Sequence, residues 1–386
     1  MTITTIAALF YYLVLGEEKK SYARLLSTAS CLSTPSLVLQ QNRFGIRGVF
    51  LGKTIKEVYE GHLLLAVPLS SCVKNLSTKK SNGDDDSSFW LAKEFLEFDN
   101  KNLLDAWSEL LPSPIDLRES LPLHWQDVAL QATSLQSFQL QAKINRDIQK
   151  NRVKRLQKHC NNSILQIQPT HLSLDDVLDL CNTRMCQVES EDLKGNIIAP
   201  AFDMINHASH GYNNASYGIE KFGNEYFLVV RSKREFEANE EILIDYGECT
   251  RDLDCVHNYG FVPRDIEAGA EITFGEKVHV LNLRRTKYGI GADLAKVASH
   301  AVENKAGDSE AEWIIGRLDE MITKTNIDFE GQDVDTRVGI VGLESALNIR
   351  RVSHKLMLIC RDRLLSEHIR NPLRKLRLSL SRPRMV

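Results

Sequence analysis

The sequence predicts an α+β fold in which two strand-rich stretches enclose a helical insert and an all-helical C-terminal domain follows. Residues 42–73 alternate short β-rich runs with glycines, which is typical of strands joined by turns. Residues 89–159 instead space their apolar side chains at helical intervals. Residues 197–262 return to strand character, and amphipathic helical patterns follow Pro263.

The expected domain boundaries follow from these changes of pattern. A strand-rich domain is expected at 41–262, with its helical insert at about 89–195. A helical domain with a basic tail is expected at 263–386, and residues 1–40 form an N-terminal segment outside both. A chain of 386 residues accommodates this division, because most domains have about 100–200 residues.

The composition is that of an ordinary globular protein, with 43% hydrophobic and 26% charged residues. The formal net charge of -3 gives no overall attraction to nucleic acid. The eight cysteines form no C-x-x-C pair and no Cys/His group with zinc-ligand spacing, so no metal site is expected. Reduced thiols are expected, which leaves the cytoplasm, the nucleus and the plastid open as compartments.

The apolar run Ile6–Leu15 is too short for a membrane span, which needs about 20 residues. Basic residues follow this run at Lys19, Lys20 and Arg24, whereas in a secretory signal they precede it. A buried first helix is therefore predicted, with a targeting signal as the alternative, and no membrane association is expected.

Turn-forming residues bound the individual elements. The runs Val49–Leu51 and His62–Val67 are predicted strands, and Gly61 and Pro68 bound the second of them. The polar stretch 79–88 is expected to be an exposed loop.

The later elements follow the same rules. Two further strands are predicted at Tyr226–Val230 and Glu241–Tyr246. The C-terminal helices are expected at Leu294–Val302, Glu312–Thr323 and Leu343–Leu365.

Two segments, 143–158 and 374–384, are strongly basic. The simplest interpretation of each is a solvated surface, and contact with acidic protein or nucleic acid is the alternative. No DNA-binding or RNA-binding signature accompanies them, so no nucleic-acid partner is expected.

Two stretches place polar residues where a strand-rich core should be apolar. They are residues 197–207 and 241–247, and the second is followed by a further motif at 258–263. Taken alone, an Asn-His pair marks a turn and a Tyr-Gly pair marks the end of a strand. The two occur in this order about 40 residues apart, which favours a functional interpretation.

These motifs resemble those of the SET-domain family, and more closely its branch that includes the Rubisco large-subunit lysine methyltransferase. Weaker similarity extends the resemblance from about residue 40 to about residue 370. The matching residues are Pro200, Asp203, Met204, Asn206 and His207 in the first motif, Glu240 or Glu241, Tyr246 and Gly247 in the second, and Tyr259, Gly260 and Phe261 in the third.

The resemblance implies a SET fold with its pseudoknot and a protein-lysine N-methyltransferase that uses S-adenosylmethionine and acts on a non-histone protein. The protein substrate would dock on the C-terminal helical domain, and the enzyme would be a monomer. Methyl transfer from a sulfonium is an in-line displacement, so the enzyme mainly aligns a neutral nucleophile with the methyl group. A phenol stays neutral near pH 7 and can orient the amine, and the family's phenol corresponds to Tyr246.

The resemblance also assigns residues to the cofactor and to the acceptor. An arginine suits the cofactor carboxylate, a glycine lets backbone approach the cofactor, and aromatic side chains suit a cationic amine. The cofactor would contact Gly48, Arg184, Asn206 and His207. The acceptor would contact Cys186, Asp203, Tyr217 and Tyr259.

The sequence departs from the family pattern in four places. Ile46 replaces a family glycine, with Gly45 one residue away, and Asn239 replaces another. Cys186 stands in place of a phenylalanine of the acceptor pocket, and 250–254 replaces the S-N-A-E-L motif. An inactive SET-fold binding module and a histidine methyltransferase of the same fold therefore stay open as alternatives.

Two of the assigned residues have other chemical interpretations. Cys186 could be a nucleophile or a redox thiol, but no neighbouring sequence suggests a lowered pKa, and a packed thiol is preferred. His207 could be a general base, whereas the resemblance implies a structural residue that faces the cofactor.

Overall fold

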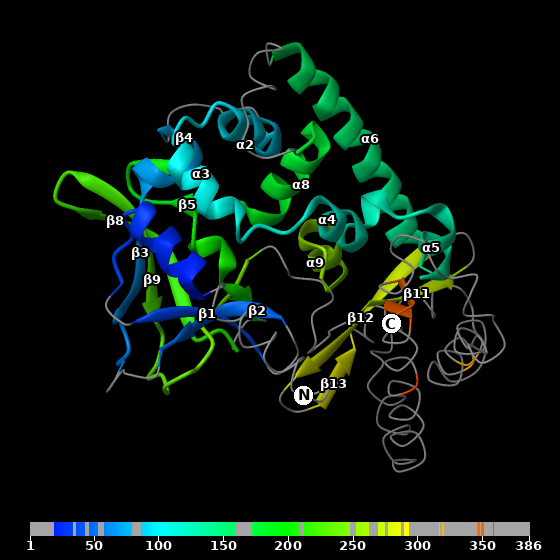
Figure 1. The fold of residues 1–386 in the computed structure, drawn as a ribbon. Coiled ribbons are helices and arrows are strands. Elements are labelled where there is room, and N and C mark those ends of the chain that lie inside the picture. The colour runs from blue at the N-terminus through cyan, green and yellow to red at the C-terminus, as the bar shows by residue number, and fades with distance from the viewer. Residues whose placement is uncertain are drawn as a thin grey trace, which may run out of the picture. The chain divides into compact units, whose positions relative to one another are not determined.

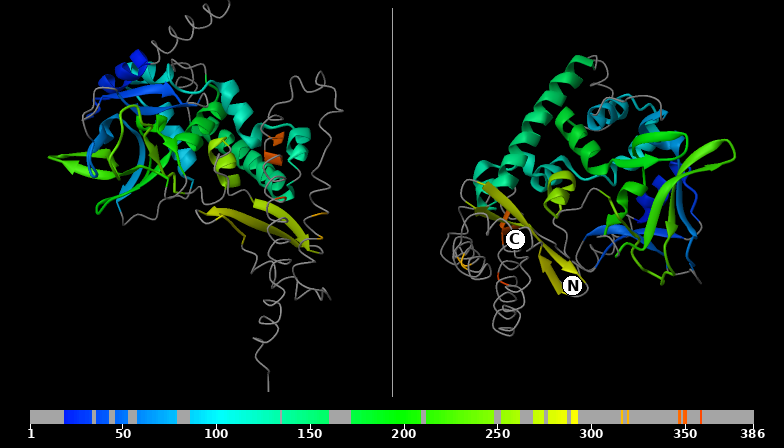
Figure 2. Two further views of the ribbon diagram at one scale, coloured as in Figure 1. Left: turned by 90° about the horizontal axis from the view of Figure 1, so that it is seen from below. Right: turned by 180° about the vertical axis from the view of Figure 1, so that it is seen from behind.

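The computed structural model describes most of the first 261 residues and a few segments beyond them. The described ranges are 19–33, 36–42, 46–52, 58–78, 86–133, 135–159, 172–208, 212–247 and 252–261, the strands between 269 and 292, and the single residues 316, 319, 346, 347, 349, 350 and 358. The chain divides into two compact units, one of residues 1–117 and 147–249 and the other of residues 118–146 and 250–386. Figure 1 labels the elements and Figure 2 shows them from two further sides.

The first unit is built largely from small sheets. One sheet has the antiparallel order β3-β9-β8, formed by Leu63–Pro68, Glu225–Ser232 and Ala215–Phe222. Another has the antiparallel order β4-β6-β5, formed by Val73–Thr78, Leu193–Ile198 and Cys186–Glu189.

Two strand pairs complete this part of the unit. β1 (Leu37–Gln41) pairs antiparallel with β2 (Arg47–Leu51). β7 (Asn206–His207) pairs in parallel with β10 (Leu243–Ile244). The strands predicted at 49–51, 62–67 and 226–230 are confirmed, and only the centre of the run predicted at 241–246 is a strand.

Side-chain caps fix where the helices of the insert begin. Asp86 accepts from the Phe89 amide at the start of α2 (Ser87–Leu96), and Asn100 does the same for α3 (Lys101–Ser108). Ser173 and Asp176 form a capping box at α8 (Leu174–Arg184). The predicted helical character of 89–159 is confirmed, with the 24-residue helix α6 (Gln136–His159) as its longest element.

The insert ends earlier than expected. Its last helix stops at Arg184, and β5 and β6 occupy 186–198, so the boundary predicted near residue 195 falls inside β6. The alternation Cys186-Gln187-Val188-Glu189, with only Val188 buried, is the period of a strand with one covered face.

Two arginines of the basic segment 143–158 form ion pairs inside the helical part of the structure. Arg152 and Arg155 contact the Asp86 carboxylate at 2.8 and 2.6 Å, and the Arg155 guanidinium lies 3.9 Å from the centre of the Phe89 ring. Two positive charges therefore hold the cap of α2, so the solvated-surface interpretation does not hold for these arginines.

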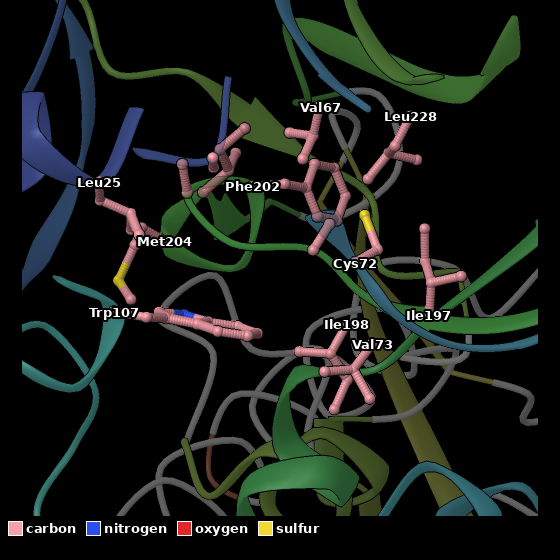
Figure 3. Close-up of a cluster of buried hydrophobic side chains, with 14 of the residues drawn as sticks. Leu25, Val67, Cys72, Val73, Trp107, Ile197, Ile198, Phe202, Met204 and Leu228 are labelled. Atoms are coloured by element: carbon pink, nitrogen blue, oxygen red, sulfur yellow. The ribbon is translucent and has the colours of Figure 1, made fainter. Parts of the chain in front are cut away.

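The apolar core of the first unit joins the sheets to the helices. Figure 3 shows part of it, where Trp107 from α3 lies among side chains from several strands. Trp107 has no exposed surface, and it is the largest fully buried side chain in this unit. Other members of this core are Leu25, Val67, Cys72, Val73, Ile197, Ile198, Phe202, Met204 and Leu228.

The second unit has a core of its own. Its described helices are α5 (Asp127–Ala132), α9 (Asp252–Tyr259), the first part of α6 and the end of α4 (Pro114–Ser120). The core side chains are Trp125, Ala129, Leu130, Leu135, Phe138, Ala142, Val256, Ala346 and Ile349.

The expected all-helical C-terminal domain is wrong for residues 269–292. β11 (Gly269–Phe274), β12 (Lys277–Thr286) and β13 (Gly289–Ala292) form an antiparallel sheet there. β-Branched residues such as Ile272, Val278 and Val280 favour strands, which explains the difference. The predicted helices at 294–302, 312–323 and 343–365 lie mostly outside the described residues.

The described part of the N-terminal segment contains a helix. The predicted helix at 6–15 lies outside the described residues, whereas 19–28 is helical, with Tyr22 and Leu25 fully buried. No helix within the described ranges is long and apolar enough to cross a membrane. Cys255 is in a disulfide bond, so the expectation of reduced thiols is wrong at this position, and Cys31, Cys72, Cys181 and Cys186 are free.

His257 makes the second unit sensitive to acid. Its Nδ1 atom is buried without a hydrogen-bond partner among the described residues, and its ring lies 4.2 Å from that of Phe138. Burial lowers the pKa of His257 from 6.5 to about 4. Between these values the unfolded chain binds a proton that the folded chain does not, so the free energy of unfolding falls as the pH is lowered from 6.5 towards 4.

Replacing His257 by phenylalanine keeps the ring and removes the titrating group. His257 is expected to lower the free energy of unfolding of the native chain by at most about 3 kcal/mol between pH 7 and pH 4. The variant is expected to lack this part of the decrease. Denaturant unfolding at both pH values checks this, with the partly exposed His124→Phe as the control. An unchanged pH dependence in His257→Phe would contradict the role of this histidine.

Candidate functional site

Three distant segments meet where the two sequence motifs come together. The segment after Asn239 runs beside β2, where the Leu51 amide donates to the Glu240 carbonyl at 3.0 Å and the Ile242 amide donates to Val49 at 2.8 Å. On its other side it pairs with β7, in the register Leu243 to Asn206. The motifs at 197–207 and 241–247 are therefore neighbours in the fold.

A buried asparagine holds this junction. The Asn214 side chain has 3% exposure, donates to the Glu241 carbonyl at 2.8 Å and accepts from the Leu243 amide at 2.8 Å. These bonds add a side-chain anchor to the strand pairing of the segment at 241–243. Sequence reasoning missed Asn214, because an asparagine before a strand is indistinguishable from an ordinary turn residue.

Asn239 explains one departure from the family pattern. Its φ is 62°, in the left-handed region where glycine is the usual residue. Asparagine adopts this conformation more readily than other residues with a side chain. The turn that leads into the Glu240–Tyr246 segment is therefore formed without the family's glycine.

Tyr246 is fixed at both its backbone and its hydroxyl group. Its hydroxyl donates to the Ile205 carbonyl at 2.7 Å, and its amide donates to Nδ1 of His207 at 3.1 Å. The rings of Tyr246 and His207 have centroids 5.1 Å apart. The phenol predicted to be catalytic thus lies directly beside the Asn-His motif.

The same hydrogen bond defines the state of His207. Because Nδ1 accepts a backbone N–H, this nitrogen carries no proton. Burial lowers the pKa of His207, although the nearby Asp245 acts in the opposite direction. The contacts of the ring with the backbones of Tyr246 and Ile244 support the structural interpretation of this residue over that of a general base.

Asn206 joins β7 to the first residue of β2. Its Nδ2 atom donates to the Arg47 carbonyl and to Oε1 of Glu241, both at 2.7 Å. A Cβ atom on Gly48 would lie 2.2 Å from that Oε1 and 2.6 Å from that Nδ2. Gly48 was expected to admit the cofactor, and in the structure any side chain at this position would displace the Asn206 amide and the Glu241 carboxylate.

Asp203 lies beneath the site in a fully buried position. Its Oδ2 accepts from the Trp107 indole at 3.1 Å and lies 3.5 Å from Nη1 of Arg184, which also donates to the Asp203 carbonyl at 2.7 Å. Oδ1 is buried and has no hydrogen-bond partner among the described residues. Burial raises the pKa of Asp203 to about 6, against the lowering effects of Arg184 and Trp107.

This burial bears on the acceptor role expected for Asp203. The side chain has 0% exposure, so the structure places it as a support for Arg184 rather than at a surface that a substrate can reach. Trp107 was missed by sequence reasoning, because a tryptophan in an amphipathic helix is most simply a core residue.

Cys186 and Tyr217 border the turn that contains Asp203. Burial raises the pKa of the Cys186 thiol, and the charge of Asp203 adds to this effect, so the packed-thiol interpretation is favoured. The Tyr217 ring packs edge-on against Phe202, with centroids 5.1 Å apart. Tyr259 belongs to the second unit, where its ring lies 6.2 Å from that of Phe261.

The site contains no evident metal-ligand set. Within the described parts of the chain, no group of three or more His, Cys, Asp or Glu side chains could hold a metal ion. The arrangement is suited to binding and orienting polar groups.

The sequence family can now be assigned. The family model of the SET domain matches residues 47–247, which include both motifs and more than half of the chain. The chain belongs to the SET-domain family. The resemblance read from the motifs is thereby confirmed, and β2, β7 and β10 are elements of this SET domain.

Solved structures show the same fold. The SET domain of LSMT bound to lysine and AdoHcy aligns with a TM-score of 0.57 at 13% identity, covering 92% of each chain. Rubisco LSMT bound to sinefungin and monomethyllysine gives 0.51 at 12% identity, covering 91% of this SET-domain chain and 92% of the other. Rubisco LSMT bound to AdoMet gives 0.50 at 12% identity, with 90% and 93% covered. None of the curated proteins compared with the chain matches it by sequence.

Proposed function

We propose that this SET-domain protein is an S-adenosylmethionine-dependent protein-lysine N-methyltransferase that acts on a non-histone protein. The observation that carries the proposal is the phenol of Tyr246, held by the Ile205 carbonyl beside the Asn206-His207 motif. The structures of similar fold were solved with AdoMet, AdoHcy, lysine or monomethyllysine, which supports the same cofactor and acceptor class.

The residues present fit this cofactor. When bound, S-adenosylmethionine supplies an activated methyl group on a sulfonium. Arg184 engages Asp203 and Met204 through Nη1 alone, and no described residue contacts its other guanidinium nitrogens. Those nitrogens suit the carboxylate of the cofactor's amino-acid end. Both N–H bonds of the Asn206 amide are used by the protein, so this residue would offer its side-chain oxygen and its backbone.

Tyr246 would align the acceptor amine. Its hydroxyl donates to the Ile205 carbonyl, and a hydroxyl oxygen that donates in this way could also accept from an amine N–H. An amine held in this way points its own lone pair towards the methyl group. Positioning of this kind accounts for much of the rate of an in-line displacement.

The acceptor side of the proposal rests on aromatic and thiol side chains. Tyr217, fixed against Phe202, would present a ring to the cationic or methylated amine. Cys186 replaces a bulkier family residue and would widen the acceptor site. Tyr259 and the chain from residue 263 onwards would contribute to docking a folded substrate protein to the monomeric enzyme.

Calorimetric titration with S-adenosylhomocysteine tests the cofactor site. The native chain is expected to bind in the micromolar range, and Asn206→Ala is expected to lose this binding. Asn196→Ala, which removes an amide bonded to Ser87 elsewhere in the unit, is the matched control and should bind like the native chain. Absence of binding by the native chain would contradict the proposal and favour a SET-fold binding module.

Mass spectrometry tests the choice of acceptor. Incubation of a protein extract with isotope-labelled S-adenosylmethionine and the native chain is expected to label lysine side chains, and not when Tyr246→Phe is used. Label found on histidine would instead identify a histidine methyltransferase of the same fold.

A further inference from the structure

We infer that Glu241 is a positioning residue of the cofactor site, which holds the side chains of Asn206 and Asn42 in their binding arrangement. This inference rests on the proposed function and adds a residue to it. The sequence motif fits either Glu240 or Glu241, and the contacts of the two carboxylates distinguish them.

The Glu241 carboxylate bonds to side chains from two other segments of the chain. Oε1 accepts from Asn206 in β7 at 2.7 Å, and Oε2 accepts from Asn42 at 3.3 Å. Asn42 in turn is bonded to Ile46 through its side chain at 3.2 Å and through its backbone at 2.8 Å. One carboxylate thus links the bonded pair Asn42 and Ile46 to the Asn-His motif.

Glu240 has a different environment. Its carboxylate pairs with the exposed Arg234, accepts from the Glu237 amide at 3.0 Å and contacts Asn214 at 3.3 Å. Successive side chains of an extended segment point to opposite sides, which explains why neighbouring glutamates have separate partners. Glu240 closes a surface turn, and Glu241 contacts the motif.

The Glu241 carboxylate and the Asn206 amide pack directly against Gly48. A Cβ atom at position 48 would meet both groups at once. In the arrangement seen here the three residues fit together because position 48 is a glycine. If the carboxylate is removed, the Asn206 amide keeps the Arg47 carbonyl as its only acceptor of the two, and Asn42 loses its bond to Glu241.

This arrangement predicts an effect on cofactor affinity that is larger than the effect on the fold. Hydrogen bonds to a charged group are strong enough that Glu241→Ala should weaken S-adenosylhomocysteine binding by roughly tenfold or more. Glu241→Gln keeps an oxygen for Asn206 and loses only the bond from Asn42, so it should recover most of the affinity. Glu240→Ala is the matched control and should bind like the native chain.

The experiment combines calorimetry with S-adenosylhomocysteine and thermal unfolding of the full chain. Similar unfolding midpoints for Glu240→Ala and Glu241→Ala, with affinity lost only in the latter and recovered in Glu241→Gln, would support the inference. Native-like affinity of Glu241→Ala would overturn the inference, and so would an equal loss of affinity in Glu241→Gln and Glu241→Ala. Neither result would affect the proposed function. Absence of binding by the native chain would instead overturn both.

A double-mutant cycle tests the contact itself. Gly48→Ala alone should weaken binding because its Cβ displaces the Glu241 carboxylate. In the Glu241→Ala background the same substitution should cost less, because one of the clashing groups is gone. Strictly additive effects would count against a direct coupling of the two residues.

Discussion

Tyr246→Phe is expected to lower the rate of methyl transfer by at least about 100-fold, because misplacement of reacting groups has effects of this size. The substitution removes the hydroxyl that donates to the Ile205 carbonyl and leaves the ring beside His207. Affinity for S-adenosylhomocysteine should change little, and stability should fall by about 1 kcal/mol for the lost hydrogen bond. Single-turnover rates with labelled S-adenosylmethionine measure the effect.

A tyrosine elsewhere in the same unit supplies the control. Tyr226 donates its hydroxyl to the Asp192 carboxylate at 2.8 Å on an exposed face, so Tyr226→Phe removes a comparable group away from the site. Its transfer rate should equal that of the native chain. Full activity of Tyr246→Phe would remove the observation on which the assignment of the catalytic phenol depends.

Trp107→Phe is expected to destabilise the first unit by about 3 kcal/mol at pH 8, because it leaves a buried carboxylate without its indole donor. The pKa of Asp203 is raised from 3.8 to about 6 by burial. The folded chain therefore holds a proton between these values that the unfolded chain has released. The contribution of this group to stability is full below pH 3.8 and is lost as the pH rises through about 6.

Loss of the indole donor in Trp107→Phe further destabilises the ionised form of the Asp203 carboxylate. The destabilisation by Trp107→Phe should thus be clearly larger at pH 8 than at pH 5, as measured by denaturant unfolding at both values. Trp125→Phe is the matched control, because the Trp125 indole donates to the uncharged Glu119 carbonyl at 2.9 Å. In an Asp203→Asn background, Trp107→Phe should destabilise the chain equally at pH 8 and pH 5. A larger destabilisation at pH 8 in that background would contradict this account.

The parts of the fold that the sequence predicted are those with a local pattern. The strands β3 and β9 and the helices of the insert follow from periodicity and from bounding turns, and the motif residues Asn206, His207 and Tyr246 are brought together as expected. The two motifs together indicated a functional site, and the parallel pair β7 and β10 joins them directly.

The parts that could not be predicted depend on partners distant in the chain. Nothing near Trp107 in the sequence reveals that its indole meets Asp203, and Asn214 becomes a site residue only through the segment it clamps. The four-residue strand β5 was missed because a short strand next to helical patterns carries a weak signal. β11 to β13 were missed because the resemblance implied a helical domain there, although their β-branched residues favour strands. The choice between Glu240 and Glu241 likewise needed the contacts of each carboxylate.

The pairing of β2 with the segment after Asn239 has a consequence for how the protein folds. The bridge between Phe50 and Glu241 joins residues that are synthesised far apart in time, with the whole helical insert between them. Contacts so distant in sequence close slowly, because the intervening loop must first lose its conformational freedom. The nascent chain can form its insert helices early, but it can acquire the Tyr246 junction only after residue 246 has left the ribosome.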